Sequence, residues 1–241
     1  MSKIALVTGA NKGIGFETVR QLAQTGAHVV LAARDRARGA EAAGELLREG
    51  LDVEALVLDV TDSGSIAAAA KEIAGKCGRL DILINNAGIS VKDGPTKPSE
   101  QSLDGWRRTF DTNVFGLIAV TQALLPLLRK SDAGRIVNVS SILASLTLHS
   151  DPKSPIYHSK IAAYNVSKTA VNAWTVQLAY ELRNTKIKVN AVHPGHVKTD
   201  MGGAQAPMEV VDGAKTSVAL ALIDADGPNG AFIHRGVVLP W

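Results

Sequence analysis

Two tyrosine–lysine pairs lie close together in residues 155–168, which read PIYHSKIAAYNVSK. Tyr157 precedes Lys160 by three residues, and Tyr164 precedes Lys168 by four. A tyrosine can act as a general acid, but its ordinary pKa of about 10 makes it a reluctant proton donor near neutral pH. A neighbouring ammonium group favours the phenolate and lowers that pKa. Either pair therefore has the residue types needed to protonate a developing alkoxide.

The flanking sequence separates the two tyrosines. Spacings of three and of four residues both place side chains on one face of a helix, so helical geometry alone does not decide. Tyr157 follows Pro155 by two residues and stands at best in the first turn of a helix. Tyr164 leads directly into SKTAVNAWTVQLAYEL, whose apolar residues recur at helical spacing. Because a proton donor needs a rigid support, we expect Tyr164 to be the acid and Tyr157 to line the pocket.

A glycine-rich turn near the amino terminus predicts a dinucleotide site. TGANKGIG (residues 8–15) follows an apolar run and opens a helical segment. In that position glycines let backbone amides approach a pyrophosphate beside the amino terminus of a helix.

The region after the second apolar run favours a phosphorylated cofactor. It reads LAARDRAR, with Arg34 where a carboxylate for the ribose 2′-hydroxyl of NAD is often found. A guanidinium matches a phosphate in charge and geometry, so Arg34 and Lys12 predict the 2′-phosphate of NADP. Asp35 is interpreted as the N-cap of the following helix. For Arg38, a phosphate contact and an exposed helix position are equally good interpretations.

The elements that must position these residues form an alternating α/β pattern. Seven short, nearly continuous apolar runs are separated by Ala-rich segments of helical period. Such runs are typical of parallel strands buried on both faces, and the spacers are long enough for crossover helices. We predict one α/β domain with a doubly wound, seven-stranded parallel sheet and helices on both faces. The predicted strands are residues 3–8, 28–32, 53–58, 80–84, 134–140, 187–192 and 231–234.

Three stretches interrupt this rhythm. They are residues 90–102, an insertion at about 143–160 and a substrate loop at about 196–210. Each follows the carboxyl end of a predicted strand, where open α/β sheets bind ligands. We expect them to form the walls of a substrate pocket.

Composition restricts the class of protein. The 241 residues contain 26 Lys and Arg against 23 Asp and Glu, with no basic cluster interleaved with aromatic residues, so we expect no nucleic-acid partner. The single Cys77 forms no internal disulfide, which fits a reducing compartment. The amino terminus lacks a signal-peptide core. The longest apolar run is broken at Thr121, Gln122 and Pro126, so we expect no membrane span and a cytoplasmic location.

Two other groups of residues resemble a hydrolytic triad and a metal site, but the sequence supports neither. Ser141, His149 and Asp151 are the residue types of a hydrolytic triad, but no G-x-S-x-G motif is present. His193 and His196 lie near Asp200, yet no third ligand has a clear spacing, so no metal site is predicted.

Seven motifs in order resemble the motif series of the short-chain dehydrogenase/reductase family, and most closely its carbonyl reductase branch. They cover most of the chain. The series consists of TGANKGIG, Asp59-Val60, NNAG (85–88), Asn113 within DTNVFG, NVSS (138–141), YNVSK (164–168) and HPGHVKTDM (193–201).

The resemblance implies a fold, an activity and a set of site residues. The fold is a single-domain Rossmann fold over residues 1–241, and the activity is NADPH-dependent reduction of a ketone or aldehyde, with a small-molecule carbonyl compound as the substrate. The implied catalytic residues are Asn113, Ser141, Tyr164 and Lys168. The implied cofactor-binding residues are Gly9, Asn11, Lys12, Gly13, Ile14, Gly15, Arg34, Asp59, Val60, Asn86, Ala87, Gly88, Tyr164, Lys168, Pro194, Gly195, Val197 and Thr199, with Asn86 beside the adenosine ribose.

Each member of the tetrad has an expected role. Tyr164 donates the proton, Lys168 tunes its pKa, and Ser141 donates a second hydrogen bond to the same oxygen. Asn113 is expected to position a water or backbone group that connects Lys168 to solvent. An NAD(H)-preferring alcohol dehydrogenase and a non-catalytic nucleotide-sensing module remain as alternatives.

Two features of the family bear on the choice of tyrosine and on assembly. Members without extra residues have about a dozen positions between the serine and the tyrosine, which is closer to Tyr157, but loops accept length changes at low entropic cost. The four-residue spacing to Lys168 therefore outweighs it and implies an insertion ahead of Tyr164. Family members pair through the helices that begin near Asn113 and Tyr164, while those with larger insertions tend to be monomers. Both states are open for this chain.

Overall fold

One sheet runs through the whole molecule. The computed structural model describes residues 2–91 and 97–241. The strand order is β3-β2-β1-β4-β5-β6-β7-β8, so the chain starts in the middle of the sheet and winds toward both edges. All seven predicted strands are confirmed: β1 (Ile4–Thr8), β2 (His28–Ala33), β3 (Val53–Val57), β4 (Ile82–Asn85), β5 (Arg135–Val139), β6 (Lys188–Val192) and β7 (Phe232–His234).

The predicted strand count was one too low. The seven predicted strands pair in parallel, and an eighth, β8 (Val237–Val238), pairs antiparallel with β7. A two-residue turn joins them, with Arg235 at φ 46° and Gly236 at φ 82°. Two positive φ values are the geometry of the hairpin turns that match strand twist. Two valines are too short a run to predict a strand.

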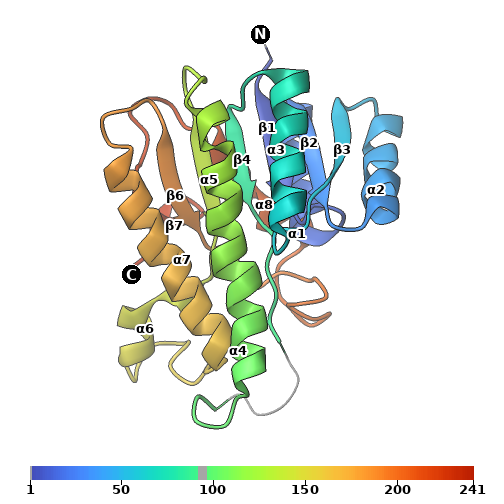
Figure 1. The fold of residues 1–241 in the computed structure, drawn as a ribbon. Coiled ribbons are helices and arrows are strands. Elements are labelled where there is room, and N and C mark those ends of the chain that lie inside the picture. Colours follow the sequence, from blue (N-terminus) through green and yellow to red (C-terminus); the bar gives the residue numbers. More distant parts are fainter. Residues whose placement is uncertain (1, 92–96) are drawn as a thin grey trace.

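Helices cover both faces of the sheet, as predicted. One face carries α3 (Ser63–Cys77), α5 (Leu117–Leu128) and α7 (Ala162–Glu181), which lie in front of the sheet in Figure 1. The other carries α1 (Gly13–Gln24), α2 (Arg36–Arg48) and α8 (Val210–Ala221). Each layer buries its own apolar cluster against the strands.

A long helical rod crosses the front face. It consists of α4 (Leu103–Phe110), the π-helical turn η1 (Asp111–Gly116) and α5. By length and composition, Leu103–Leu128 is apolar enough to cross a membrane, with a mean hydropathy of 1.4 over its most apolar window. Half of that window is buried inside the fold, as in a core helix.

The insertion is not the plain loop that was expected. It contains the 3₁₀ turn η2 (Ile142–Ala144) and the short helix α6 (Leu146–Ser150), which lies beside the lower half of α7 in Figure 1. Ser141 Oγ accepts from the amide of Leu143, and Ser145 caps α6 in the same way. These side-chain caps, and not a periodic apolar pattern, set the two short helices. Tyr157 lies in turns ahead of α7, as predicted.

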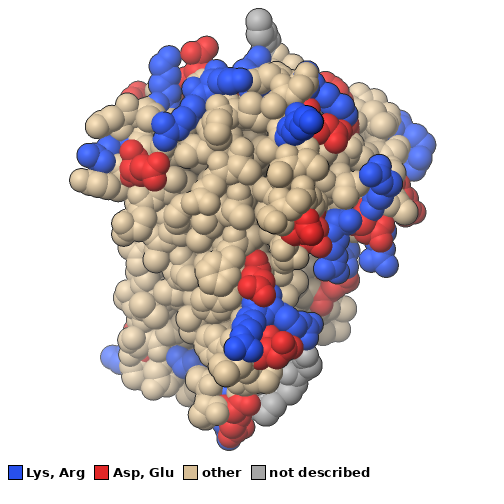
Figure 2. All heavy atoms as spheres, in the orientation of Figure 1, with Lys and Arg blue, Asp and Glu red and all other residues tan. Residues whose placement is uncertain are grey.

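The outer surface over α5 and α7 is largely uncharged. Figure 2 shows a broad tan area there, with Lys and Arg interspersed with Asp and Glu around its rim. Phe115, Val166, Val176 and Tyr180 are exposed apolar or aromatic side chains of these helices and of η1. Whether a second copy covers this face stays a prediction.

Candidate active site

Tyr164 and Lys168 come together on the first turns of α7. Tyr164 is the third residue of the helix, and Lys168 follows one turn later. Lys168 is only 4% exposed, and its Nζ lies 5.8 Å from the centroid of the Tyr164 ring. That Nζ donates a hydrogen bond of 2.8 Å to the carbonyl of Val139, at the end of β5. The ammonium group therefore links the tyrosine helix to the strand that leads to Ser141.

Ser141 lies close enough to the phenol of Tyr164 to lower its pKa, and the predicted roles of the two hydroxyls toward a substrate stay predictions. The expected direction of its pKa was wrong, however. Burial raises the pKa of Tyr164 above 10, and the nearby Ser141 hydroxyl offsets this only in part. Lys168 turns its ammonium toward Val139, so burial outweighs its effect. The phenol consequently keeps its proton at neutral pH.

Burial acts on Lys168 in the opposite sense. Removing an ammonium group from water disfavours its charged form. The pKa of Lys168 is lowered from 10.5 to about 8. The residue is thus charged at neutral pH but titrates within the range of an ordinary assay.

Asn113 ties three parts of the site together. It is fully buried in η1, its Oδ1 accepts from the amide of Ile89 at 2.8 Å, and its Nδ2 donates to the Ile89 carbonyl at 2.9 Å. Nδ2 also donates to Ser167 Oγ at 3.0 Å, and this hydroxyl donates to the carbonyl of Tyr164 at 2.7 Å. The side chain is therefore engaged with protein groups, and its link to solvent stays a prediction. Ser167 was missed, although it lies within YNVSK.

Gly88 lies directly against this cluster. A Cβ atom added at Gly88 would lie 3.3 Å from Lys168 Nζ and 3.4 Å from Asn113 Oδ1. The backbone at Gly88 therefore lies close to the buried lysine and asparagine, and the contact of Gly88 with a cofactor stays a prediction.

Asn86 is hydrogen-bonded to the glycine turn. Its Nδ2 donates to the carbonyls of Thr8 and Gly9, at 2.9 and 3.1 Å. Thr8 Oγ1 in turn accepts from the amides of Asn86 and Ala87, both at 3.0 Å. The side chain of Asn86 therefore fastens the glycine turn to the end of β4, and its contact with a ribose stays a prediction. Thr8 was not predicted to contribute.

The glycine turn fits a pyrophosphate. Gly9 has φ 61°, and a Cβ there would lie 2.9 Å from Ala87 Cα. Lys12 precedes α1 without a capping side chain, and the first turn of α1 contains no acidic residue. The first amides of α1, beside Asn11 and Ile14, are therefore suited to an anion.

The two cations predicted to bind one phosphate have different surroundings. Arg34 is exposed directly after β2, and its charge contributes to the lowered pKa of Asp59, whose main cause is the hydrogen bond from the Thr61 amide. Lys12 instead bonds Asp200 of the substrate loop at 2.5 Å. Arg34 thus lies near Asp59, while Lys12 bridges the glycine turn and the substrate loop. Asp35 caps α2 through the Arg38 amide at 2.9 Å, as predicted.

The histidines near the substrate loop have structural partners. His193 accepts from the amide of Gly195 at 3.3 Å and stacks on His234, with 4.7 Å between ring centroids. Burial, followed by the charges of His234 and His196, lowers the pKa of His193 to about 3. Among residues 2–91 and 97–241, no group of three or more His, Cys, Asp or Glu is arranged to hold a metal ion.

The substrate loop reaches the glycine turn. A Cβ at Gly13 would lie 3.4 Å from Thr199 Cγ2, and Val197 is buried where it pairs with Met208. Gly195, with φ 103°, follows Pro194 and packs against Met208. Thr199, a predicted cofactor-binding residue of this loop, therefore lies beside the glycine turn. Of the first predicted pocket wall, residues 92–96 lie outside the described part of the chain.

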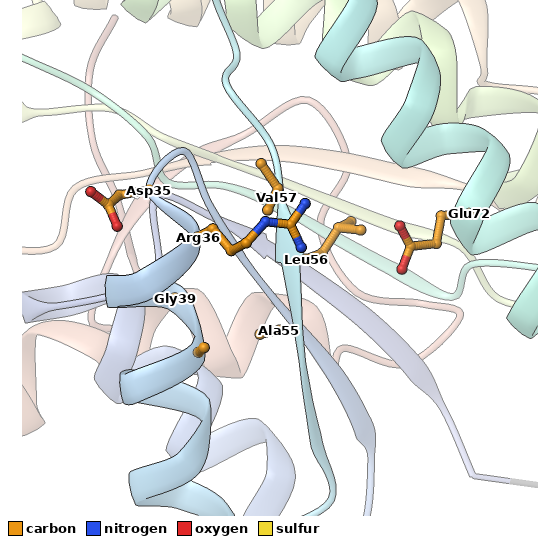
Figure 3. A pocket seen from close by; sticks show the side chains of 8 residues that line it. Asp35, Arg36, Gly39, Ala55, Leu56, Val57 and Glu72 are labelled. Carbon is orange, nitrogen blue, oxygen red and sulfur yellow. The ribbon is translucent and has the colours of Figure 1, made fainter.

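A surface pocket lies far from Ser141, Tyr164 and Lys168. Figure 3 shows it between α2, β3 and α3, with Asp35, Arg36 and Glu72 among its lining residues. β3 is the edge strand, and β2, β1 and β4 separate it from the strand that leads to Ser141. It is therefore not the site of the tetrad.

Comparison with known proteins decides the family. The family model described as short chain dehydrogenase matches residues 3–210. The chain belongs to the short-chain dehydrogenase family. This confirms the resemblance and, with the sheet described above, the predicted Rossmann-type fold.

Relatives of this short-chain dehydrogenase include several reductases. It is 37% identical to carbonyl reductase (NADPH) 1 of Bos taurus, across 99% of this chain and 98% of the relative. It is 35% identical to the (-)-isopiperitenone reductase of Mentha piperita, with the same coverage. An NADPH-bound carbonyl reductase from chicken fatty liver superimposes with a TM-score of 0.87, at 29% identity and over 100% and 99% of the two chains.

Proposed function

We propose that this short-chain dehydrogenase reduces a ketone or aldehyde to an alcohol with NADPH, and that Tyr164 donates the proton. The observation that carries the proposal is the environment of the phenol. Tyr164 lies beside Ser141, keeps its proton at neutral pH, and has a buried lysine one turn away on the same helix, whose ammonium group favours the phenolate once the proton has left. A phenol that holds its proton is the form that reduction consumes.

The residues divide the chemistry among them. When bound, NADPH supplies the hydride to the carbonyl carbon. Tyr164 and Ser141 each offer a hydroxyl to the carbonyl oxygen, so that negative charge developing there meets two donors already in place. Tyr164 gives up its proton, and the ammonium group of Lys168 favours the resulting phenolate. Ser141 keeps its proton and remains a hydrogen-bond donor.

The support for NADPH over NADH lies at the end of β2. Arg34 stands there, exposed, where a carboxylate would favour a ribose hydroxyl. Curated relatives at 37% identity carry NADPH in their names. Lys12 is the second candidate for the 2′-phosphate, and it must then leave or share Asp200.

Turnover tests the reaction. Purified protein is mixed with NADPH and a panel of aryl ketones, diketones and quinones, and the nicotinamide absorbance is followed. Loss of absorbance that depends on the ketone supports the proposal. A protein that binds NADPH but turns over none of the panel contradicts it.

Cofactor preference is tested separately. Arg34→Asp replaces the phosphate-binding charge with one that repels a phosphate, so it should reverse the ratio of kcat/KM for NADPH and NADH. Arg38→Asp, four residues on in α2, is the matched control, with a smaller expected effect. An unchanged ratio in Arg34→Asp would remove Arg34 from the cofactor site.

A further inference from the structure

The side chain of His149 contacts both ends of the insertion and also helix α7, which carries Tyr164. His149, in α6, has its Nε2 3.1 Å from the carbonyl of Leu143, where the insertion begins. Its Nδ1 lies 3.1 Å from Nζ of Lys160, where the insertion ends, and this Nζ also donates to the His149 carbonyl at 3.0 Å. The side-chain nitrogen Nδ2 of Asn165, the residue after Tyr164, lies 3.2 Å from Nε2 of His149. We call His149, Lys160 and Asn165 the insertion hub.

The partners of His149 determine its tautomer. Lys160 has only N–H donors, so Nδ1 of His149 must accept, and the ring proton is then on Nε2. Nε2–H donates to the carbonyl of Leu143, and Nδ2 of Asn165, which is itself only a donor, packs against Nε2 without a hydrogen bond. Asn165 Nδ2 meanwhile donates to the Ser159 carbonyl at 2.8 Å, just before α7. The hub therefore requires a neutral imidazole, with its two nitrogens in different roles.

The second tyrosine–lysine pair is part of this arrangement. Nζ of Lys160 lies 4.9 Å from the centroid of the Tyr157 ring. An ammonium at that distance from an aromatic face is attracted to it. The Lys160 ammonium thus joins the Tyr157 ring to His149 and holds the end of the insertion to its short helix.

We propose that the insertion hub positions residues 143–160 against α7 and thereby selects bulky carbonyl substrates over small ones. His149 and Lys160 are positioning residues, because they act through the segment that follows Ser141. This inference rests on the proposed function, since selection is read from ketone reduction. The segment carries the apolar side chains of Leu143 and Leu148, which are partly exposed, and of Leu146, which is 62% exposed. A bulky apolar substrate would cover these side chains, whereas a small one would not reach them.

Two diketones that differ in size measure the selection. The kcat/KM values for benzil and for 2,3-butanedione are compared in the wild type and in His149→Phe, which keeps the ring and removes both nitrogens. We expect the benzil to butanedione ratio to fall about tenfold, mainly through the KM for benzil, with the Kd for NADPH unchanged. His149→Gln keeps an N–H where Nε2 lies and should recover part of the ratio. His158→Phe, on the exposed neighbouring histidine, is the matched control and should leave it unchanged.

The pH dependence gives a second, independent signature. Burial, and then the charge of Lys160, lowers the pKa of His149 below 6.5. Lys160 is the charged group that faces the His149 ring. The other groups against the ring are the Leu143 carbonyl of η2 and the Asn165 side-chain amide of α7. The carboxylate of Asp151 accepts from the Lys153 amide. Protonation puts an N–H on Nδ1 toward the Lys160 ammonium and opens the hub. The ratio should therefore fall at acid pH in the wild type, and it should be low and independent of pH in His149→Phe and in Lys160→Met.

Hydrogen exchange tests the hub without any substrate. Amides of residues 143–160 should exchange at least tenfold faster in His149→Phe than in the wild type or in His158→Phe. Faster exchange in a chain that reduces no ketone would sustain the hub and reject the proposed function. Unchanged exchange, or an unchanged diketone ratio in an active enzyme, would overturn the hub.

Discussion

The two tyrosine–lysine pairs of this chain contain the same residue types and differ in where the fold places them. The ammonium of Lys160 is the closer one, 4.9 Å from the ring of Tyr157, against 5.8 Å between Lys168 and the ring of Tyr164. Yet Lys160 is exposed and Tyr157 lies in turns, whereas Lys168 is buried and Tyr164 stands on a twenty-residue helix. Closeness of a cation to a phenol is therefore not what distinguishes an acid.

Burial and attachment make the difference. Only the buried pair is connected to Ser141 and, through Ser167, to Asn113. In the buried pair the loss of water acts on both partners, raising the pKa of Tyr164 and lowering that of Lys168. The exposed pair, Tyr157 and Lys160, instead holds the end of the insertion to α6 through His149.

The sharpest contrast is between the two phenylalanine variants. Tyr164→Phe removes the proton donor, so kcat should fall by about 10²- to 10⁴-fold, the usual contribution of general acid catalysis. Tyr157→Phe keeps the ring that faces Lys160, and its kcat should stay within about threefold of the wild type. Steady-state rates with a small diketone, together with NADPH binding by fluorescence, make the comparison. A larger loss in Tyr157→Phe than in Tyr164→Phe would reverse the assignment.

The pH profile should show the buried lysine. The value of kcat/KM for NADPH reports groups of the free enzyme, and the ammonium of Lys168 is lost as pH rises through about 8. The activity should therefore decline above that pH, approaching about tenfold per unit when one protonated group is required. Lys168→Met should remove the break near pH 8, and Lys160→Met should retain it. A flat profile to pH 10 in the wild type would exclude a requirement for the ammonium form.

A methyl group beside the buried pair should reduce activity moderately. In Gly88→Ala the new Cβ lies 3.3 Å from Lys168 Nζ, so the lysine must shift by a few tenths of an ångström. We expect a loss of about tenfold in kcat/KM, because small displacements of catalytic groups are costly. Gly75→Ala is the control: this glycine is exposed in α3, and its Cβ would meet nothing within 4 Å. It should leave activity unchanged and raise the free energy of unfolding by about 0.5–1 kcal/mol. Equal activity in both alanine variants would mean that the site tolerates movement of Lys168.

The smallest effect concerns stability. The pKa of Lys168 is lower in the folded chain than its ordinary 10.5, so burial of the ammonium destabilises the fold below pH 8, and this cost fades as pH rises toward 10.5. Lys168→Met removes the cost but leaves the Val139 carbonyl without its bond, for a net gain of about 1 kcal/mol in the free energy of unfolding at pH 7.

Lys160→Met should change the free energy of unfolding in the opposite direction. It loses an exposed cation–π contact, and the free energy of unfolding should fall by about 0.5–1 kcal/mol. Urea unfolding at pH 7 measures both variants. Destabilisation of several kcal/mol by Lys168→Met would show that the lysine supports the fold as well as the reaction.

Much of the fold could be predicted because buried parallel strands leave continuous apolar runs. All seven such runs became strands, to within about two residues at each end. The missing strand, Val237–Val238, has no such run, because an edge strand of two residues depends on the turn at Arg235 and Gly236. α6 was missed for a similar reason: five residues held by the cap at Ser145 show no helical periodicity.

The candidate site was predictable as a set of residues and less so as a set of interactions. Tyr164, Ser141, Lys168, Asn113 and Gly88 do meet in space. The direction of the Tyr164 pKa was wrong, because it depends on burial that the sequence does not display. His149 carried the signal of a hydrolytic triad only, since its partners at Leu143 and Asn165 become neighbours through the path of the insertion.

The π turn at Asp111–Gly116 has a consequence for how this chain can be aligned and redesigned. A π turn holds one residue more than an α turn, so its backbone bonds skip five positions in place of four. Rebuilding the same number of residues as an unbroken α-helix would rotate everything before the turn by about 100° about the helix axis relative to α5. Leu103 and Trp106 would then face new directions while Leu124 and Leu128 stayed in place. The π turn therefore sets the rotation of α4 relative to α5. If the segment were transferred to another protein as a regular α-helix of the same length, Asn113 would lose its alignment with Ile89 and Ser167.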